Sequence, residues 1–195
     1  MDAVSSPVAD GDLLRRIAGG DAAAIGELYD RYASVLFPLA LRVLRDRAEA
    51  EDVVHDAFVI VADRAAQYAP DRGPVGAWLV TLVRNLSIDR TRRRDRRRAI
   101  AHDVVAHEPV AVVDDPEQLT SDAGERARIR RALASLPEAQ RSTLEIAFFE
   151  GLTYPEIAAR EGVPLGTIKS RAARGILSLR EALSLEAAGD HAGET

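Results

Sequence analysis

Two basic segments with helical periodicity lie far apart in this otherwise acidic chain. The first, residues 78–98, ends in a run of arginines, and the second, residues 154–174, has the pattern of two short helices joined at a glycine. The net charge is -5, yet residues 84–98 hold eight arginines against two aspartates, a local charge of +6. Clustered arginines are typical of surfaces that bind nucleic acid. The pairing predicts that one chain contacts DNA at two separate places.

Length and composition limit the classes of fold. A chain of 195 residues makes one domain or two small ones, and a hydrophobic share of 47% is enough to bury a core. No apolar run reaches the roughly 20 residues that a membrane helix needs, and residues 1–11 lack the features of a signal peptide. The absence of cysteine excludes disulfides and thiolate metal sites. These features fit a soluble, cytoplasmic protein.

Apolar residues recur at helical spacing along most of the chain, and no strand pattern persists. We therefore expect an all-α fold of two small helical domains, residues 12–98 and 123–185. A flexible acidic linker, residues 99–122, should join them. We expect residues 1–11 to be disordered and residues 186–195 to form a loose tail.

The expected helices have recognisable ends. Gly19 and Gly20 should end a short first helix, Asp21 should cap a long second helix, and Pro38 should kink it. Two prolines and a glycine predict a loop at residues 68–75. The expected helices span residues 12–17, 22–44, 48–63, 78–98, 123–136, 138–150, 154–161 and 165–185.

The last two helices have the composition of a helix-turn-helix. Ala158 is the small residue that lets a second helix cross closely, and Gly162 allows the turn. Apolar residues should lock the pair together: Ile157, Val163 and Ile168. Thr153 and Glu156 form a capping box at the start. The second helix carries side chains suited to base edges and phosphates, namely Thr167, Lys169, Ser170, Arg171 and Arg174. An ordinary helical hairpin with a basic outer face is the alternative.

The basic helix at residues 78–98 is amphipathic. Its apolar side consists of Trp78, Leu79, Leu82 and Leu86, and we place Trp78 in the core. Its polar side carries candidate DNA contacts, namely Arg84, Asn85, Asp89, Arg92 and Arg93. Arginine supplies affinity for phosphate, whereas Asn and Asp can add base contacts. A solvated or generally nucleic-acid-binding tail is the alternative.

Six motifs in a fixed order resemble one family. They are ELYDRY at residues 27–32, AEAEDVVHDAF at 48–58, AWLVTLVRNLSID at 77–89, LPEAQR at 136–141, FEGLTYPEIA at 149–158 and VPLGTIKSR at 163–171. Together they look like the extracytoplasmic function (ECF) sigma factors of bacterial RNA polymerase. The resemblance covers roughly residues 12–98 and 123–185, in the family's order.

The resemblance implies a division of labour. Residues 12–98 match sigma region 2, which docks on the polymerase and opens the minus-ten element. Residues 123–185 match region 4, which reads the minus-thirty-five element. The acidic helix matches the part that binds the polymerase clamp coiled coil, and its docking candidates are Glu51, Asp52, Asp56 and Phe58. The 68–75 loop matches the loop that captures a flipped base of the non-template strand. His55 and Val75 depart from the family, which often has Gln and Phe there.

The resemblance also implies partners. Such factors bind core RNA polymerase and promoter DNA, and an anti-sigma factor, often membrane-anchored, usually holds them inactive. The helical domain that housekeeping sigma factors carry has no room in residues 99–122, so the chain resembles the minimal, alternative kind. The acids of this linker are Asp103, Glu108, Asp114, Asp115, Glu117 and Asp122. The linker is either a plain tether or a strand that threads a basic channel of the polymerase, as the family's linker does.

Two other classes fit parts of the sequence. A one- or two-component regulator shares the helix-turn-helix but needs a receiver or ligand domain with strands, and residues 1–98 show no strand pattern. A metal phosphohydrolase could use His55 and Asp56. The remaining histidines lie in the expected linker and tail: His102, His107 and His191. No nucleophile triad or phosphate-binding glycine loop is seen. We therefore expect no catalytic residue, no metal, no cofactor and no small-molecule substrate.

Overall fold

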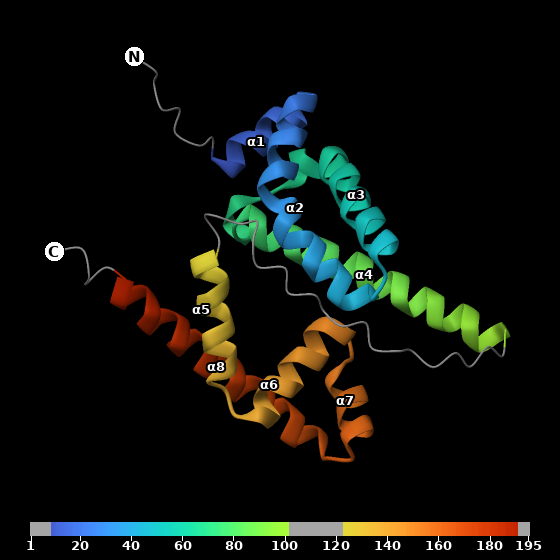
Figure 1. Cartoon of the computed structure of the whole chain (residues 1–195), viewed down its shortest axis with the longest axis vertical. Coiled ribbons are helices and arrows are strands. Elements are labelled where there is room, and N and C mark those ends of the chain that lie inside the picture. The colour runs from blue at the N-terminus through green and yellow to red at the C-terminus, as the bar shows by residue number, and fades with distance from the viewer. Residues whose placement is uncertain (1–8, 102–122, 191–195) are drawn as a thin grey trace. The chain divides into compact units, whose positions relative to one another are not determined.

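The computed structural model describes residues 9–101 and 123–190, and every regular element in these two stretches is helical. They belong to two compact units (Figure 1). The prediction of an all-α chain with two helical domains is confirmed. Residues 1–8, 102–122 and 191–195 lie outside the described residues, and with them most of the predicted N-terminal segment, nearly all of the predicted linker, and the end of the tail.

The N-terminal unit is a set of helices with capped ends. Its elements are α1 (Asp10–Ala18), α2 (Ala22–Leu44), α3 (Arg47–Arg64), the short 3-10 turns η1 (Ala65–Gln67) and η2 (Pro70–Arg72), and α4 (Val75–Ala101). The carboxylates of Asp21 and Asp46 accept hydrogen bonds from the backbone N–H groups of Ala23 and Glu49, each at 3.0 Å. A cap of this kind stabilises a helix by about 1 kcal/mol. The predicted cap at Asp21 is confirmed.

One core joins the four helices of this unit. Its fully buried side chains include Leu28, Leu36, Val61, Leu79 and Val83, and burying each one stabilises the fold by roughly 1.5–3 kcal/mol. Trp78 packs against this core, as predicted. The C-terminal part of α4, light green in Figure 1, projects beyond the other helices. The same helix is therefore a core element at its start and an exposed rod at its end.

Several helix boundaries in this unit differ from the prediction. Helix α4 begins at Val75, directly after Pro74, rather than at residue 78, and Val75 is a core residue with 3% exposure. It also continues beyond residue 98 to Ala101. Helix α2 continues through the exposed Pro38. It ends at Leu44 and is capped by Arg45, which adopts the left-handed conformation with φ 56°.

The C-terminal unit is described from residue 123 to residue 190. Its elements are α5 (Ala123–Ala134), α6 (Glu138–Glu145), the π-helical turn η3 (Ile146–Glu150), α7 (Tyr154–Glu161) and α8 (Leu165–Asp190). The helix expected at residues 138–150 thus divides into an α-helix and a wide π turn, which stops at Gly151 with φ 67°. Helix α8 continues five residues past the expected end at 185. The added turn contains Glu and Ala, which are strong helix formers.

Helix α8 organises this unit because α5, α6 and α7 all pack against it. The close approach to α6 depends on Gly175: a Cβ atom there would lie 3.0 Å from Cδ1 of Leu144 and 3.3 Å from Cβ of Gln140. Ile157 of α7 and Ile168 of α8 are fully buried against each other's helices. These contacts hold the N-terminal half of α8 in a fixed orientation to α7.

Candidate nucleic-acid interface

The turn between α7 and α8 has the predicted helix-turn-helix chemistry. The backbone N–H of Thr153 donates to Oε2 of Glu156 at 2.6 Å, and the N–H of Glu156 donates to Oγ1 of Thr153 at 3.4 Å. This reciprocal pair is the predicted capping box. Gly162 has φ 67° and ψ 28°, and its N–H donates to the carbonyl of Ala158. The turn needs a left-handed backbone conformation at this position, and glycine adopts it at little steric cost.

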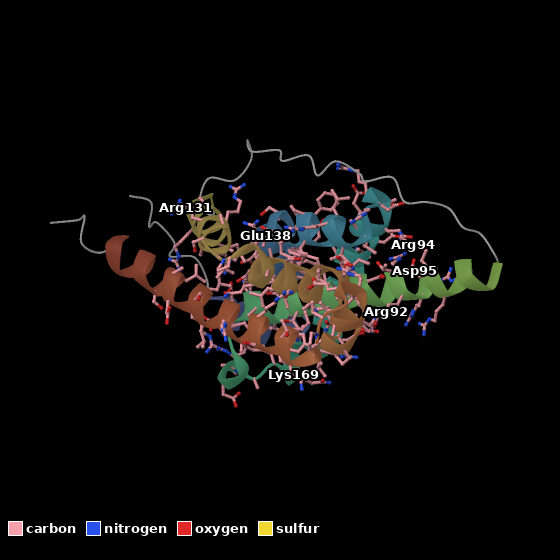
Figure 2. The ribbon with its side chains drawn as sticks, turned by 90° about the horizontal axis from the view of Figure 1, so that it is seen from below. Arg92, Arg94, Asp95, Arg131, Glu138 and Lys169 are labelled. Atoms are coloured by element: carbon pink, nitrogen blue, oxygen red, sulfur yellow. The ribbon has the colours of Figure 1, made fainter. Side chains whose placement is uncertain are left out.

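The predicted DNA-contacting residues occupy the first turns of α8. Lys169, labelled in Figure 2, and Arg174 are exposed, and Thr167, Ser170 and Arg171 are half-buried. Arg171 is tied to the protein: its Nη1 lies 2.9 Å from Oε2 of Glu161, the last residue of α7, with side-chain exposures of 28% and 23%. In this structure Arg171 therefore links the two helices of the motif.

A second ion pair links α7 to the π turn that precedes it. Arg160 near the end of α7 donates to Glu150, the last residue of the π turn. Hydrogen bonding to Glu150 raises the pKa of the Arg160 guanidinium above its ordinary value. The sequence pattern did not single out this pair, because the two residues lie ten positions apart on different elements.

One face of α4 presents the predicted first DNA element. Asn85, Asp89, Arg92 and Arg93 are exposed, and Arg84 is half-buried. Burial first, and then repulsion from Arg92, lower the pKa of the Arg84 guanidinium below its ordinary value. The ordinary pKa of arginine lies far above neutral pH, so the group stays charged at neutral pH. The structure therefore keeps all five predicted residues on the accessible part of the helix.

The opposite face of α4 contacts the acidic helix α3. Arg90 places Nη2 3.1 Å from Oδ2 of Asp52 and Nη1 3.8 Å from Oδ2 of Asp56. One turn later, Nη1 of Arg94 lies 3.3 Å from Oε2 of Glu49 and 3.3 Å from the carbonyl of Leu44. The arginine run therefore has two faces, and Figure 2 shows Arg92 and Arg94 on opposite sides of α4.

Arg90 and Arg94 were not among the predicted site residues. A signal for them was present, since they are four residues apart and so share one face of a helix. Their partners Glu49, Asp52 and Asp56 follow the same periodicity on α3. The spacing alone could not show that this face of α4 packs against the acidic face of α3.

The predicted docking residues divide into an exposed group and a core residue. Three of them, Glu51, Asp52 and Asp56, are exposed on α3. Glu51 also forms an ion pair with Arg47, with Nε of Arg47 2.9 Å from Oε1 of Glu51. Phe58 is only 4% exposed, and its ring centroid lies 5.0 Å from that of Tyr29. A docking role for the Phe58 side chain is therefore wrong: it is a core residue that holds α3 against α2.

The 68–75 loop is folded back on itself. The hydroxyl of Tyr68 donates to the carbonyl of Gly73 at 2.7 Å, and the ring of Tyr68 packs on that of Trp78 with centroids 5.7 Å apart. Gly73 has φ 124° and ψ 174°, a conformation that other residues rarely adopt. Val75, at the position where the family often has Phe, is buried and anchors the end of the loop in the core.

The described residues show neither a metal-ligand cluster nor a membrane-spanning helix. No group of three or more His, Cys, Asp or Glu side chains within residues 9–101 and 123–190 could hold a metal ion, and His55 is exposed on α3. None of the helices in these ranges has the length and hydrophobicity to cross a membrane.

Comparison with known proteins agrees with this geometry. The family models Sigma-70 region 2 and Sigma-70, region 4 match residues 28–97 and 126–179, and these two regions define the chain as a sigma factor. The chain is 34% identical over 175 residues to the ECF RNA polymerase sigma factor SigK of Mycobacterium tuberculosis (strain H37Rv), covering 89% of this chain and 92% of SigK. SigK of Mycobacterium sp. (strain KMS) is 34% identical over 177 residues, covering 89% and 90%. The chain belongs to the ECF RNA polymerase sigma factor family.

Solved structures give related matches. SigE of Rhodobacter sphaeroides in complex with the anti-sigma ChrR is 33% identical, with 91% of this chain and 99% of that chain covered and a TM-score of 0.46. CnrH in complex with the cytosolic domain of CnrY is 25% identical, with 90% and 97% covered and a TM-score of 0.41.

Family membership settles the class of function. The protein is an alternative sigma factor that directs RNA polymerase to promoters. The regulator and the phosphohydrolase fall away as alternatives, because both regions of a sigma factor are present in order.

Proposed function

We propose that the two units divide the work of promoter recognition between them. Residues 12–98 dock on core polymerase and open the minus-ten element, and residues 123–185 read the minus-thirty-five element, with the linker at residues 99–122 between them. The observation that carries this proposal is the two-sided helix α4. One face pairs with the acidic helix α3 and the other presents arginine, asparagine and aspartate to solvent.

The upstream element is read by the start of α8. Lys169 and Arg174 are exposed and basic, and Thr167 and Ser170 add hydroxyl groups on the same turns. Residues near the start of the second helix of this motif reach base edges in the major groove. Arg171 contributes from its place against Glu161, where it orients the helix and remains close to the groove.

The downstream element is opened by α4 and the 68–75 loop together. Extruding a base from the duplex costs a few kcal/mol, and contacts to the displaced strand must offset this cost. The exposed Arg92 and Arg93 supply contacts to phosphates, and Asn85 and Asp89 supply groups for base edges. The rigid loop, held by Tyr68, receives the base.

Docking uses the exposed carboxylates of α3. Glu51, Asp52 and Asp56 meet a basic surface of the polymerase clamp, and complementary charge both speeds encounter and fixes the register of the complex. The chemistry of RNA synthesis belongs to the polymerase, so we infer that this protein acts beside it in the cytoplasm as a non-enzymatic factor. An anti-sigma factor, membrane-anchored in many members of the family, is the remaining partner. Co-purification of the tagged chain with a membrane fraction tests that partner.

Footprinting of the promoter complex tests the division of labour. Lys169→Ala should weaken protection at the upstream element alone, and Arg92→Ala with Arg93→Ala should weaken it at the minus-ten element alone. Arg180→Ala, an exposed arginine distant from the start of α8, is the matched control and should leave both intact. Loss of both protected regions from either test variant counts against two independent DNA contacts.

A further inference from the structure

The first turn of α4 is pressed against a tyrosine of α2. A Cβ atom at Gly76 would lie 2.9 Å from Cε1 and 3.2 Å from the hydroxyl of Tyr32. Contacts under 3.0 Å between a Cβ and another side chain are essentially never seen, so a larger residue forces the tyrosine ring to move. Gly76 lies inside a helix, and space rather than backbone freedom is what it provides.

The same tyrosine also contacts α1. Its hydroxyl donates to the carboxylate of Asp10, which also accepts from Arg31. Asp10 is the first residue of α1, Tyr32 lies in the middle of α2 and Gly76 is the second residue of α4. Residues from three helices, at positions 10, 32 and 76 of the chain, therefore meet at one side chain.

The 68–75 loop ends at this contact. Only Pro74 and Val75 separate Gly73, whose carbonyl accepts from Tyr68, from Gly76. Val75 is buried and Trp78, one turn further on, packs under the ring of Tyr68. A shift in the first turn of α4 should therefore also shift the 68–75 loop.

We propose that Tyr32, held by Asp10 and seated on Gly76, is a positioning residue for promoter opening. It fixes the first turn of α4 and so sets where the 68–75 loop stands when it receives an extruded base. Tyr32 acts through the loop and α4 rather than by contact with DNA. The inference rests on the proposed role of the loop in base capture.

A glycine pair provides the central experiment. Gly76→Ala should slow promoter opening by roughly tenfold, because a misplaced capture loop loses contacts that offset the cost of extrusion. Gly26→Ala, on α2 with nothing within 4 Å of the added Cβ, is the matched control and should open promoters at the normal rate. Opening is followed with a fluorescent base analogue in the non-template strand, and core binding is followed separately by competition. Core affinity should be unchanged in both variants.

Two further comparisons separate positioning from folding. Tyr32→Phe keeps the ring and removes the hydroxyl, so it should slow opening, and it should have little added effect in an Asp10→Ala background, which already lacks the acceptor. Gly76→Ala combined with Tyr32→Ala should be no slower than Tyr32→Ala alone, because the ring that clashed is gone. Hydrogen exchange of the α4 amides reports whether each variant remains folded.

The outcomes distinguish this inference from the proposed function. Replacing Pro70–Arg72 with three glycines tests the loop itself, and normal opening by that variant overturns the capture role. If the loop variant fails to open promoters while Gly76→Ala and Tyr32→Phe open them normally, the positioning role alone is overturned. An equal loss of core binding and opening in Tyr32→Phe also overturns it, because the residue then serves the fold as a whole.

Discussion

Arg90 of α4 forms ion pairs with two of the carboxylates that we assign to polymerase docking. These pairs predict the direction in which removal of Arg90 changes the affinity for core polymerase. The distances to Asp52 and Asp56 are 3.1 and 3.8 Å. If the polymerase needs these carboxylates, it must compete with Arg90 for them. Removing Arg90 should therefore strengthen core binding, whereas removing Asp52 should weaken it.

The exposure of the three groups limits the size of the effect. Side-chain exposures are 35% for Arg90, 64% for Asp52 and 62% for Asp56, and exposed pairs contribute only about 0.2–1 kcal/mol. The upper value corresponds to about fivefold in affinity, since 1.4 kcal/mol is tenfold. We expect Arg90→Ala to tighten core binding by about twofold to fivefold, and the gain to shrink as salt increases.

The assay is competition between the unlabelled variant and the labelled wild-type chain for core polymerase, without DNA. Arg15→Ala is the matched control, because Arg15 forms an ion pair with Asp12 within α1 and neither residue belongs to the proposed docking surface. A double-mutant cycle of Arg90→Ala with Asp52→Ala isolates the coupling. Weaker core binding by Arg90→Ala refutes the reasoning, since Arg90 must then support the docking surface rather than cover it.

Three other sets of substitutions test the upstream contact, the docking surface and the linker. Lys169→Ala and Arg171→Ala should each weaken binding to the upstream element by about 1–3 kcal/mol with core binding intact. Only Arg171→Ala should also speed hydrogen exchange where α7 meets α8, because it breaks the pair with Glu161; loss of core binding by either variant contradicts the assignment. Asp52→Arg or Asp56→Arg should impair association with core polymerase, since a reversed charge meets a fixed basic partner, and unchanged competition against other sigma factors contradicts this. Replacing the six linker acids with Ser and Gln at constant length should reduce promoter opening or initial RNA synthesis if the linker threads a basic channel, whereas full transcription across salt concentrations leaves only the tether. The acids concerned are Asp103, Glu108, Asp114, Asp115, Glu117 and Asp122.

Local chemistry made much of the fold predictable. The cap at Asp21, the capping box at Thr153 and the left-handed turn at Gly162 depend on a few neighbouring residues, and all three are confirmed. The helices themselves could be predicted because apolar residues recur at helical spacing over long stretches. The π turn before Gly151 was not predicted, because the distinction between an α-helix and a π turn leaves no mark in that periodicity.

The site was less predictable, because its chemistry depends on which faces meet. Phe58 lies next to exposed acids in the sequence but turns toward Tyr29 in the core. Arg90 and Arg94 lie in the same arginine run as Arg92 and Arg93, yet they face α3. Composition alone assigns all these arginines to DNA. Only the packing of α3 on α4 separates the arginines that pair with α3 from those that we propose to contact DNA.

Transcription from a library of genomic promoter fragments, with purified core polymerase and the full chain, tests the central claim most directly. We expect transcripts that require the chain and that begin downstream of two shared sequence elements at a fixed spacing. Lys169→Ala should relax the sequence of the upstream element alone. Transcripts that start equally well without the chain, or sequence-specific binding to a single element in the absence of polymerase, would contradict it.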